Sequence, residues 1–125
     1  MAPHTPEECD ALFAQHVQAG ELDALVALYE PNAALVQQDG SAATGHAAIR
    51  EGLAGFVALR PSLRMNVLRV VRAADDLAVL YNDWSGSATA PDGSTMTFAG
   101  RAVEIVRRQS DGSWRFAIDD PWARG

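Results

Sequence analysis

The sequence predicts an α+β fold in which helices from the first half of the chain pack on an antiparallel sheet formed mainly by the second half. Two observations lead to this prediction. Apolar residues recur at helical spacing in three segments before Pro61, and four β-rich runs separated by turn signals follow it. With 125 residues, of which 48% are hydrophobic, the chain can bury one core, so we expect a single domain over residues 1–125.

The first helix is expected over residues 6–19. Thr5 can cap its N-terminus, Pro6 suits the first helical position, and Gly20 ends the apolar stripe. This stripe contains residues at helical spacing, namely Cys9, Leu12, Phe13, His16 and Val17.

A short second helix is expected after Gly20, because Leu22, Leu25, Val26 and Tyr29 repeat the helical spacing until Pro31. A brief extended segment over residues 33–37 and a turn over residues 38–41 should follow. The third helix begins near residue 44 and ends before Pro61, since the residue before a proline avoids helical angles.

Four strands are expected at about residues 63–72, 77–88, 95–108 and 114–119. Pro91-Asp92-Gly93 and Ser110-Asp111-Gly112 separate the later runs and are typical of turns between antiparallel strands. The second half of the chain is therefore expected to form an antiparallel meander.

Both faces of the strand that begins at Thr95 are largely apolar. One face carries Ala99, Arg101, Val103 and Ile105, and the other carries Met96, Phe98, Ala102, Glu104 and Val106. A sheet face that meets only water should be more polar, so we expect a second copy of the chain to cover it. The sequence thus predicts a homodimer formed through the sheet.

Composition excludes several classes of function. The formal net charge of −6 has the wrong sign for nucleic-acid binding. The N-terminus lacks the pattern of a signal peptide, and no apolar run approaches about 18 residues, so we expect a soluble, cytoplasmic protein that does not bind membranes. The single cysteine, the spacing of the three histidines and the absence of a glycine-rich phosphate loop predict no disulfide, no metal and no cofactor.

The chain resembles the nuclear transport factor 2-like superfamily over about residues 6–122, in particular its SnoaL-like and ketosteroid isomerase-like members. The resemblance is carried by the segment from Gly20 to Ala33, by Gly45-His46-Ala47-Ala48-Ile49-Arg50 and by Asp111-Gly112-Ser113-Trp114-Arg115. It implies three N-terminal helices on a curved antiparallel sheet, a cone-like barrel with a pocket, similar to small bacterial stand-alone members of uncharacterised function. The same fold serves isomerases, cyclases, hydrolases and transport adaptors, so it does not by itself imply an activity.

The residues that such an isomerase needs are not found at the matching positions. Aligned with the family, Gln37 stands where the carboxylate base would be, Phe13 where the tyrosine would be, and Arg101 where the protonated aspartic acid would be. Asp119 lies near the acid of limonene epoxide hydrolase, another member, but the positions of that enzyme's arginine and second aspartate here hold Trp84 and Gly86. Neither mechanism is therefore inherited directly.

Arg101 is the strongest candidate for a ligand anchor. A guanidinium among apolar neighbours needs a carboxylate or an anionic ligand. Three alternatives remain open: Asp119 or Asp83 pairs with Arg101 in a structural ion pair, Arg101 faces the pocket and holds a carboxylate, enolate or phenolate, or its side chain is simply exposed. Gln37, Phe13, Phe56, Trp84 and Trp122 are the further candidates for contact with a ligand.

Three residues are candidates for an acid or base if the pocket is catalytic: Asp119, Asp83 and His16. His16 can also be a hydrogen-bonded histidine of the core. Trp84 and Trp122 can likewise be core residues rather than walls of a pocket. The leading hypothesis is a pocket for a small apolar ligand with an acidic or carbonyl group. The alternatives are a SnoaL-like enzyme, and a dimeric interaction module whose interior is filled by side chains such as Phe56 and Trp84.

Overall fold

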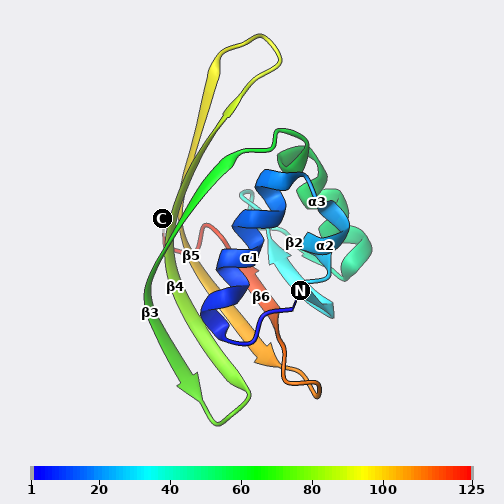
Figure 1. The fold of residues 1–125 in the computed structure, drawn as a ribbon, viewed down its shortest axis with the longest axis vertical. Coiled ribbons are helices and arrows are strands. Elements are labelled where there is room, and N and C mark those ends of the chain that lie inside the picture. Colours follow the sequence, from blue (N-terminus) through cyan, green and yellow to red (C-terminus); the bar gives the residue numbers. More distant parts are fainter. Residues whose placement is uncertain (1, 125) are drawn as a thin grey trace.

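The computed structural model describes residues 2–124, and the predicted α+β architecture is confirmed (Figure 1). Six strands form one sheet, and three helices lie on one side of it. The helices are α1 (Pro6–Ala19), α2 (Leu22–Val26) and α3 (His46–Ala58). The strands are β1 (Tyr29–Val36), β2 (Ala42–Thr44), β3 (Ser62–Ala73), β4 (Leu77–Thr89), β5 (Thr95–Arg108) and β6 (Trp114–Asp120).

Helix α1 has the predicted bounds and the predicted caps. The Thr5 hydroxyl accepts a hydrogen bond from the Glu8 backbone N–H at 3.3 Å, and Pro6 occupies the first turn. Gly20 ends the helix with a φ of 74°, a conformation that glycine adopts without strain. The helix buries Cys9 and Val17 completely, which fixes its apolar side against the sheet.

The prediction that the second helix extends to Tyr29 is wrong. Helix α2 ends at Val26, and Tyr29 begins strand β1. Pairing with β6 overrides the helical spacing, because the Phe116 N–H donates to the Leu28 carbonyl at 2.8 Å and Tyr29 lies opposite Phe116. Pro31 is accommodated at an irregularity in this pairing, where its missing N–H breaks no regular ladder.

The sheet has the strand order β2-β1-β6-β5-β4-β3. Strands β3 to β6 form the predicted antiparallel meander, whereas β1 pairs with β6 in parallel and β2 was not predicted. The outermost strands, β2 and β3, do not pair with each other, so the curved sheet is open and the expected barrel does not close.

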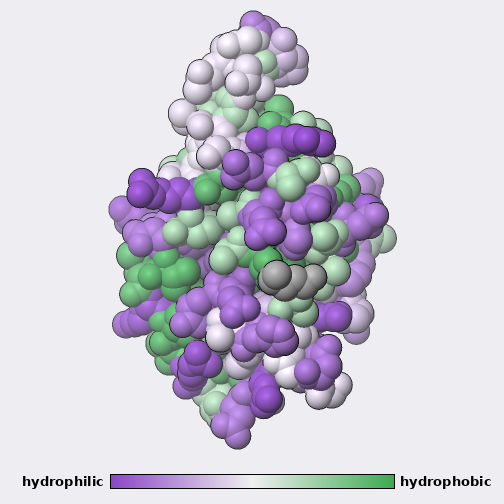
Figure 2. Space-filling view, viewed as in Figure 1, coloured by the Kyte–Doolittle hydropathy of each residue, from purple (hydrophilic) through white to green (hydrophobic). Residues whose placement is uncertain are grey.

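The core lies between the helices and the concave face of the sheet. Its largest fully buried side chains include Tyr29, Phe116, Leu25, Ile49 and Leu80. Near the turn between them, β4 and β5 form a hairpin that extends beyond the helices (Figure 1), and its protruding end is white to purple in hydropathy (Figure 2). Exposed apolar residues also occur on β3, where Leu68 is 54% and Val71 is 46% exposed.

No helix within residues 2–124 is long and apolar enough to cross a lipid bilayer.

Candidate functional site

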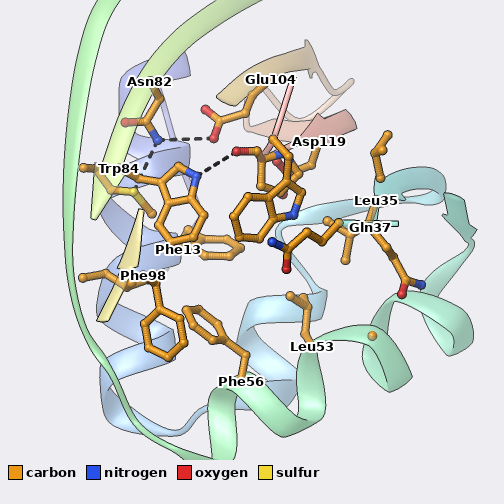
Figure 3. A pocket seen from close by; sticks show the side chains of 17 residues that line it. Phe13, Leu35, Gln37, Leu53, Phe56, Asn82, Trp84, Phe98, Glu104 and Asp119 are labelled. Atoms are coloured by element: carbon orange, nitrogen blue, oxygen red, sulfur yellow. Dashed lines mark hydrogen bonds between the residues drawn. The ribbon is translucent and has the colours of Figure 1, made fainter. Parts of the chain in front are cut away.

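A cavity of about 300 Å³ lies between the concave face of the sheet and helices α1 and α3 (Figure 3). Its walls are mainly apolar, and five of the lining residues are aromatic: Phe13, Phe56, Trp84, Phe98 and Trp122. Five others carry polar side chains: Gln37, Gln38, Asn82, Glu104 and Asp119. The cavity thus combines aromatic walls with a small number of polar groups, as small-molecule sites commonly do.

The aromatic side chains hold one another in place. The rings of Phe56 and Phe98 meet edge to face at 5.2 Å, and those of Trp84 and Trp122 do the same at 5.2 Å. The Trp84 indole N–H donates to the Pro121 carbonyl at 2.9 Å. This bond ties the segment after β6 to strand β4 and closes one wall of the cavity.

Asp119 is buried and hydrogen-bonded to Tyr29. The Tyr29 hydroxyl donates to the Asp119 carboxylate over 2.5 Å, and the two side chains are 0% and 3% exposed respectively. Burial raises the pKa of Asp119 to about 7, although the hydrogen bond from Tyr29 opposes the rise. This carboxyl can therefore gain and lose a proton close to neutral pH.

Glu104 lies on the neighbouring strand, opposite Asp119 in the register of β5 and β6. The Asn82 amide N–H donates to Glu104 Oε2 at 3.4 Å, and the Asn82 oxygen accepts from the Asn66 backbone N–H at 2.9 Å. Burial, and then the nearby carboxylates of Asp10 and Asp119, raise the pKa of Glu104 well above its usual range. These surroundings thus favour the protonated form of Glu104.

Arg101 does not line the cavity, which corrects the expectation that it anchors a ligand there. It is exposed on the outer face of the sheet, because alternate residues of β5 face opposite ways and Glu104 takes the inward face. Asp83, directly opposite Arg101 on β4, also faces outward and pairs with Arg124 at 2.7 Å. Asp83 is therefore not placed to act as an acid or base in the cavity.

His16 is also outside the cavity. It is buried near the end of α1, where its Nδ1 lies 3.0 Å from Glu21 Oε1, as the interpretation of a hydrogen-bonded core histidine expects. The other candidates do line the cavity: Phe13, Gln37, Phe56, Trp84, Asp119 and Trp122. Within residues 2–124, no cluster of three or more His, Cys, Asp or Glu side chains is placed to hold a metal ion.

Sequence reasoning missed Tyr29, Asn82, Glu104 and Asp10 as parts of this site. Glu104 carried a usable signal, because it was the one charged residue on an otherwise apolar strand face. No sequence signal identifies Tyr29 as a site residue, since its spacing from Leu25 and Val26 is typical of a helix. Asn82 becomes significant only through the pairing of β4 with β5, and Asp10 only through the burial of its side of α1.

The set of lining side chains limits the chemistry of a ligand. Over the described residues 2–124, the cavity lining includes no lysine, arginine or histidine. Its ionisable groups are two carboxyls with raised pKa values, which shows that the site disfavours negative charge.

Comparisons with solved structures reveal the same fold. A candidate scytalone dehydratase from Novosphingobium aromaticivorans matches with a TM-score of 0.80 and 17% identity, over 91% of this chain and 78% of that one. A ketosteroid isomerase-like protein from Erwinia carotovora matches with a TM-score of 0.76 and 18% identity, over 91% and 89% of the two chains.

A candidate calcium/calmodulin-dependent protein kinase type II association domain from Thiobacillus denitrificans matches with a TM-score of 0.75 and 22% identity, over 97% of each chain. At these identities the likeness concerns the fold alone. No curated protein matches the chain. The family model of the SnoaL-like domain matches residues 10–117, which is most of the sequence. The chain therefore belongs to the SnoaL-like domain family.

Proposed function

We propose that the cavity binds a small, largely apolar, uncharged molecule with one carbonyl or hydroxyl group. The observation that carries this proposal is the pair of buried carboxyls, Glu104 and Asp119, set in a cavity whose walls are mainly aromatic and aliphatic. A protonated carboxyl donates a hydrogen bond to a carbonyl or hydroxyl oxygen, whereas a carboxylate ligand would meet like charge and no cation. The expectation of an acidic ligand depended on Arg101 and is dropped with it.

An open cavity of about 300 Å³ also supports binding over the alternative of an interaction module with a filled interior. Phe56 and Trp84 pack against other aromatic side chains at the walls and leave this volume free.

A thermal-shift experiment tests the proposal, because a ligand that binds only the folded state raises the melting temperature. The probe is α-tetralone, a neutral bicyclic ketone, compared with a tetralin carboxylate of the same ring skeleton. We expect the ketone, and not the carboxylate, to raise the melting temperature at about pH 8. Equal stabilisation by both, or by neither, would overturn the proposal.

A matched pair of variants locates the binding. Val36→Trp places a large side chain in the cavity wall, and Val71→Trp makes the same change on exposed β3. We expect the first variant to lose the shift caused by α-tetralone and the second to keep it. Binding that survives Val36→Trp would place the ketone elsewhere on the protein.

Asp119 favours a second candidate function, general acid–base catalysis. In this mechanism the Asp119 carboxylate removes a proton from the carbon next to a carbonyl, Glu104 hydrogen-bonds to the oxygen that gains charge, and Asp119 returns the proton. No other reactant is needed, since the electron pair that leaves the C–H bond returns to carbon when the proton is restored. A pKa of about 7 suits both directions of transfer.

Exchange of the α-protons of α-tetralone for deuterium in heavy water measures this step directly by NMR. We expect the wild type to accelerate the exchange and Asp119→Asn to reduce it by about 10²- to 10⁴-fold. Asp75→Asn, the same change in the exposed turn after β3, is the control. Exchange at the wild-type rate in Asp119→Asn would refute the catalytic role.

We also propose that the outer face of the sheet forms a homodimer. Val103, Ile105 and Ile118 make an apolar centre on this face, and Ile118 is 43% exposed. Arg101 and Asp83 lie beside it, so the surface carries both signs of charge. A two-fold interface requires a self-complementary patch, which suits a second copy of the chain.

A further inference from the structure

The segment that follows β6 forms a wall of the cavity without belonging to a helix or strand. The pairing of β6 with β5 ends at Asp120, opposite Val103. Pro121 and Trp122 come next and line the cavity, within a turn over residues 121–124. The ladder between β5 and β6 does not extend to this wall, so the position of the wall depends on individual contacts.

On the cavity side, the segment 121–124 contacts Trp84. The Trp84 indole crosses over Gly100, its partner on β5, and its N–H donates to the Pro121 carbonyl at 2.9 Å (Figure 3). The rings of Trp84 and Trp122 meet edge to face at 5.2 Å. These contacts hold Trp122 against the cavity only while the segment stays beside β5.

On the outer side of the sheet, Arg124 fastens the same segment. Its backbone N–H donates to the Arg101 carbonyl at 3.0 Å. Its guanidinium donates to Asp83 at 2.7 Å and to the Ala102 carbonyl at 3.3 Å, and lies 5.8 Å from the centre of the Tyr81 ring. Arg124 Nε is buried and has no hydrogen-bond partner within residues 2–124, so its release into water would restore a bond to this group. The ion pair with Asp83 opposes that release.

We propose that Asp83 and Arg124 are positioning residues: their ion pair on the outer face holds the segment 121–124 beside β5, keeps Trp122 against the cavity, and so sets how often this wall opens. Neither side chain lines the cavity, so both act through the backbone of the segment. The two side chains are 30% and 39% exposed for Arg124 and Asp83, and ion pairs at such exposure are weak enough to open reversibly. The part of this inference that concerns a ligand rests on the proposed function, and the part that concerns the segment does not.

Hydrogen exchange of the Trp84 indole N–H in heavy water, followed by NMR, tests the segment without any ligand. This N–H is bonded to Pro121, so it exchanges when the segment moves away. We expect Asp83→Asn to raise its exchange rate about 2- to 5-fold. Asp23→Asn is the matched control, because it removes the exposed ion pair with Arg50 between α2 and α3 and should leave the rate unchanged.

The indole N–H of Trp114, at the opposite end of β6 from the segment, is the internal reference. An unchanged Trp84 rate in Asp83→Asn would overturn the proposal. An equal rise at Trp114 would also overturn it, because the whole fold rather than the segment would then be destabilised. Arg124→Lys keeps the charge and should exchange more slowly than Arg124→Gln. Equal exchange in these two variants would show that the charge does not position the segment.

Titration with α-tetralone, followed through the line shape of the Trp84 indole signal, tests whether this wall admits the ligand. We expect Asp83→Asn to raise the association and dissociation rate constants by the same factor as the exchange rate, and to leave Kd within about twofold of wild type. A weaker Kd with an unchanged association rate would contradict entry through this wall. If α-tetralone does not bind the wild type, the proposed function alone fails, and the exchange of the free protein still decides the role of Asp83 and Arg124.

Discussion

Replacing Asp119 by asparagine should change the stability of the fold in opposite directions at low and high pH. The pKa of Asp119 rises from 3.8 to about 7 on folding, mainly through burial. The folded state therefore binds a proton more tightly than the unfolded state. Stability from this group is complete below about pH 4 and is lost as the pH rises towards about 7. At 1.36 kcal/mol per pKa unit, the loss approaches about 4 kcal/mol.

Asparagine does not titrate, so the variant does not lose this stability as the pH rises. Its oxygen can still accept the hydrogen bond from Tyr29, but its buried NH₂ group costs about 1 to 2 kcal/mol. At about pH 8, Asp119→Asn should therefore be more stable than wild type by about 2 to 3 kcal/mol. At about pH 4 it should be less stable by about 1 to 2 kcal/mol.

Urea unfolding monitored by tryptophan fluorescence measures these free energies at each pH, since Trp84 and Trp114 are buried. Asp75→Asn, in an exposed turn, is the control and should stay within about 0.5 kcal/mol of wild type. An Asp119→Asn variant that is destabilised equally at both pH values would refute the reasoning. It would mean that the Asp119 pKa does not rise on folding.

Three further predictions concern the walls of the cavity and the outer face. Gly100→Ala should lower stability by about 1 to 3 kcal/mol in thermal denaturation, because its Cβ would lie 2.6 Å from Trp84 Nε1 and 2.7 Å from the Pro121 carbonyl oxygen; an unchanged melting temperature would contradict this packing. Arg101→Ala should stay within about 0.5 kcal/mol of wild type and keep the thermal shift with α-tetralone, since its side chain is exposed outside the cavity; loss of the shift would restore Arg101 as a ligand anchor. Ile105→Glu should convert the proposed dimer to a monomer in sedimentation equilibrium, because it places a charge in the apolar centre of the outer face. The circular dichroism spectrum should stay unchanged. A dimer that persists would exclude this face as the interface.

Local signals account for the parts of the fold that the sequence predicts well. Thr5, Pro6 and Gly20 bound α1 because caps and backbone angles depend on neighbouring residues. The turns at Gly93 and Gly112 have positive φ angles of 87°, as the antiparallel meander requires. Long-range pairing explains the errors. Tyr29 continues a helical pattern, yet its partner Phe116 is far away in the sequence, and no local signal indicates the parallel pairing.

In the candidate site too, local patterns predict some features, whereas features that depend on long-range packing are missed. The alternation of side chains along β5 correctly places Arg101 and Glu104 on opposite faces of the strand. Because both faces are largely apolar, the pattern does not say which of them meets the helices. Of the alternatives for Arg101, the structure matches exposure outside the cavity, and Glu104 is the charged residue of β5 that lines it. Trp84 and Phe56 are notable because aromatic residues make up only 7% of the sequence, and Asp119 because the family resemblance places an acid near the end of the last strand. Asp10 is not, because its burial depends on which side of α1 faces the sheet.

The position of β6 in the sheet has a consequence for how the chain folds during synthesis. Strand β6 is synthesised after β1 to β5 but is inserted between β1 and β5, so the early and late parts of the sheet remain separate until residues 114–120 are available. Sequence-distant pairing of this kind slows folding. The contact between Tyr29 and Asp119, which are 90 positions apart, forms only when this strand docks. Proton uptake by Asp119 should therefore accompany the final folding step, and its rate can be followed with a pH indicator after refolding begins near neutral pH.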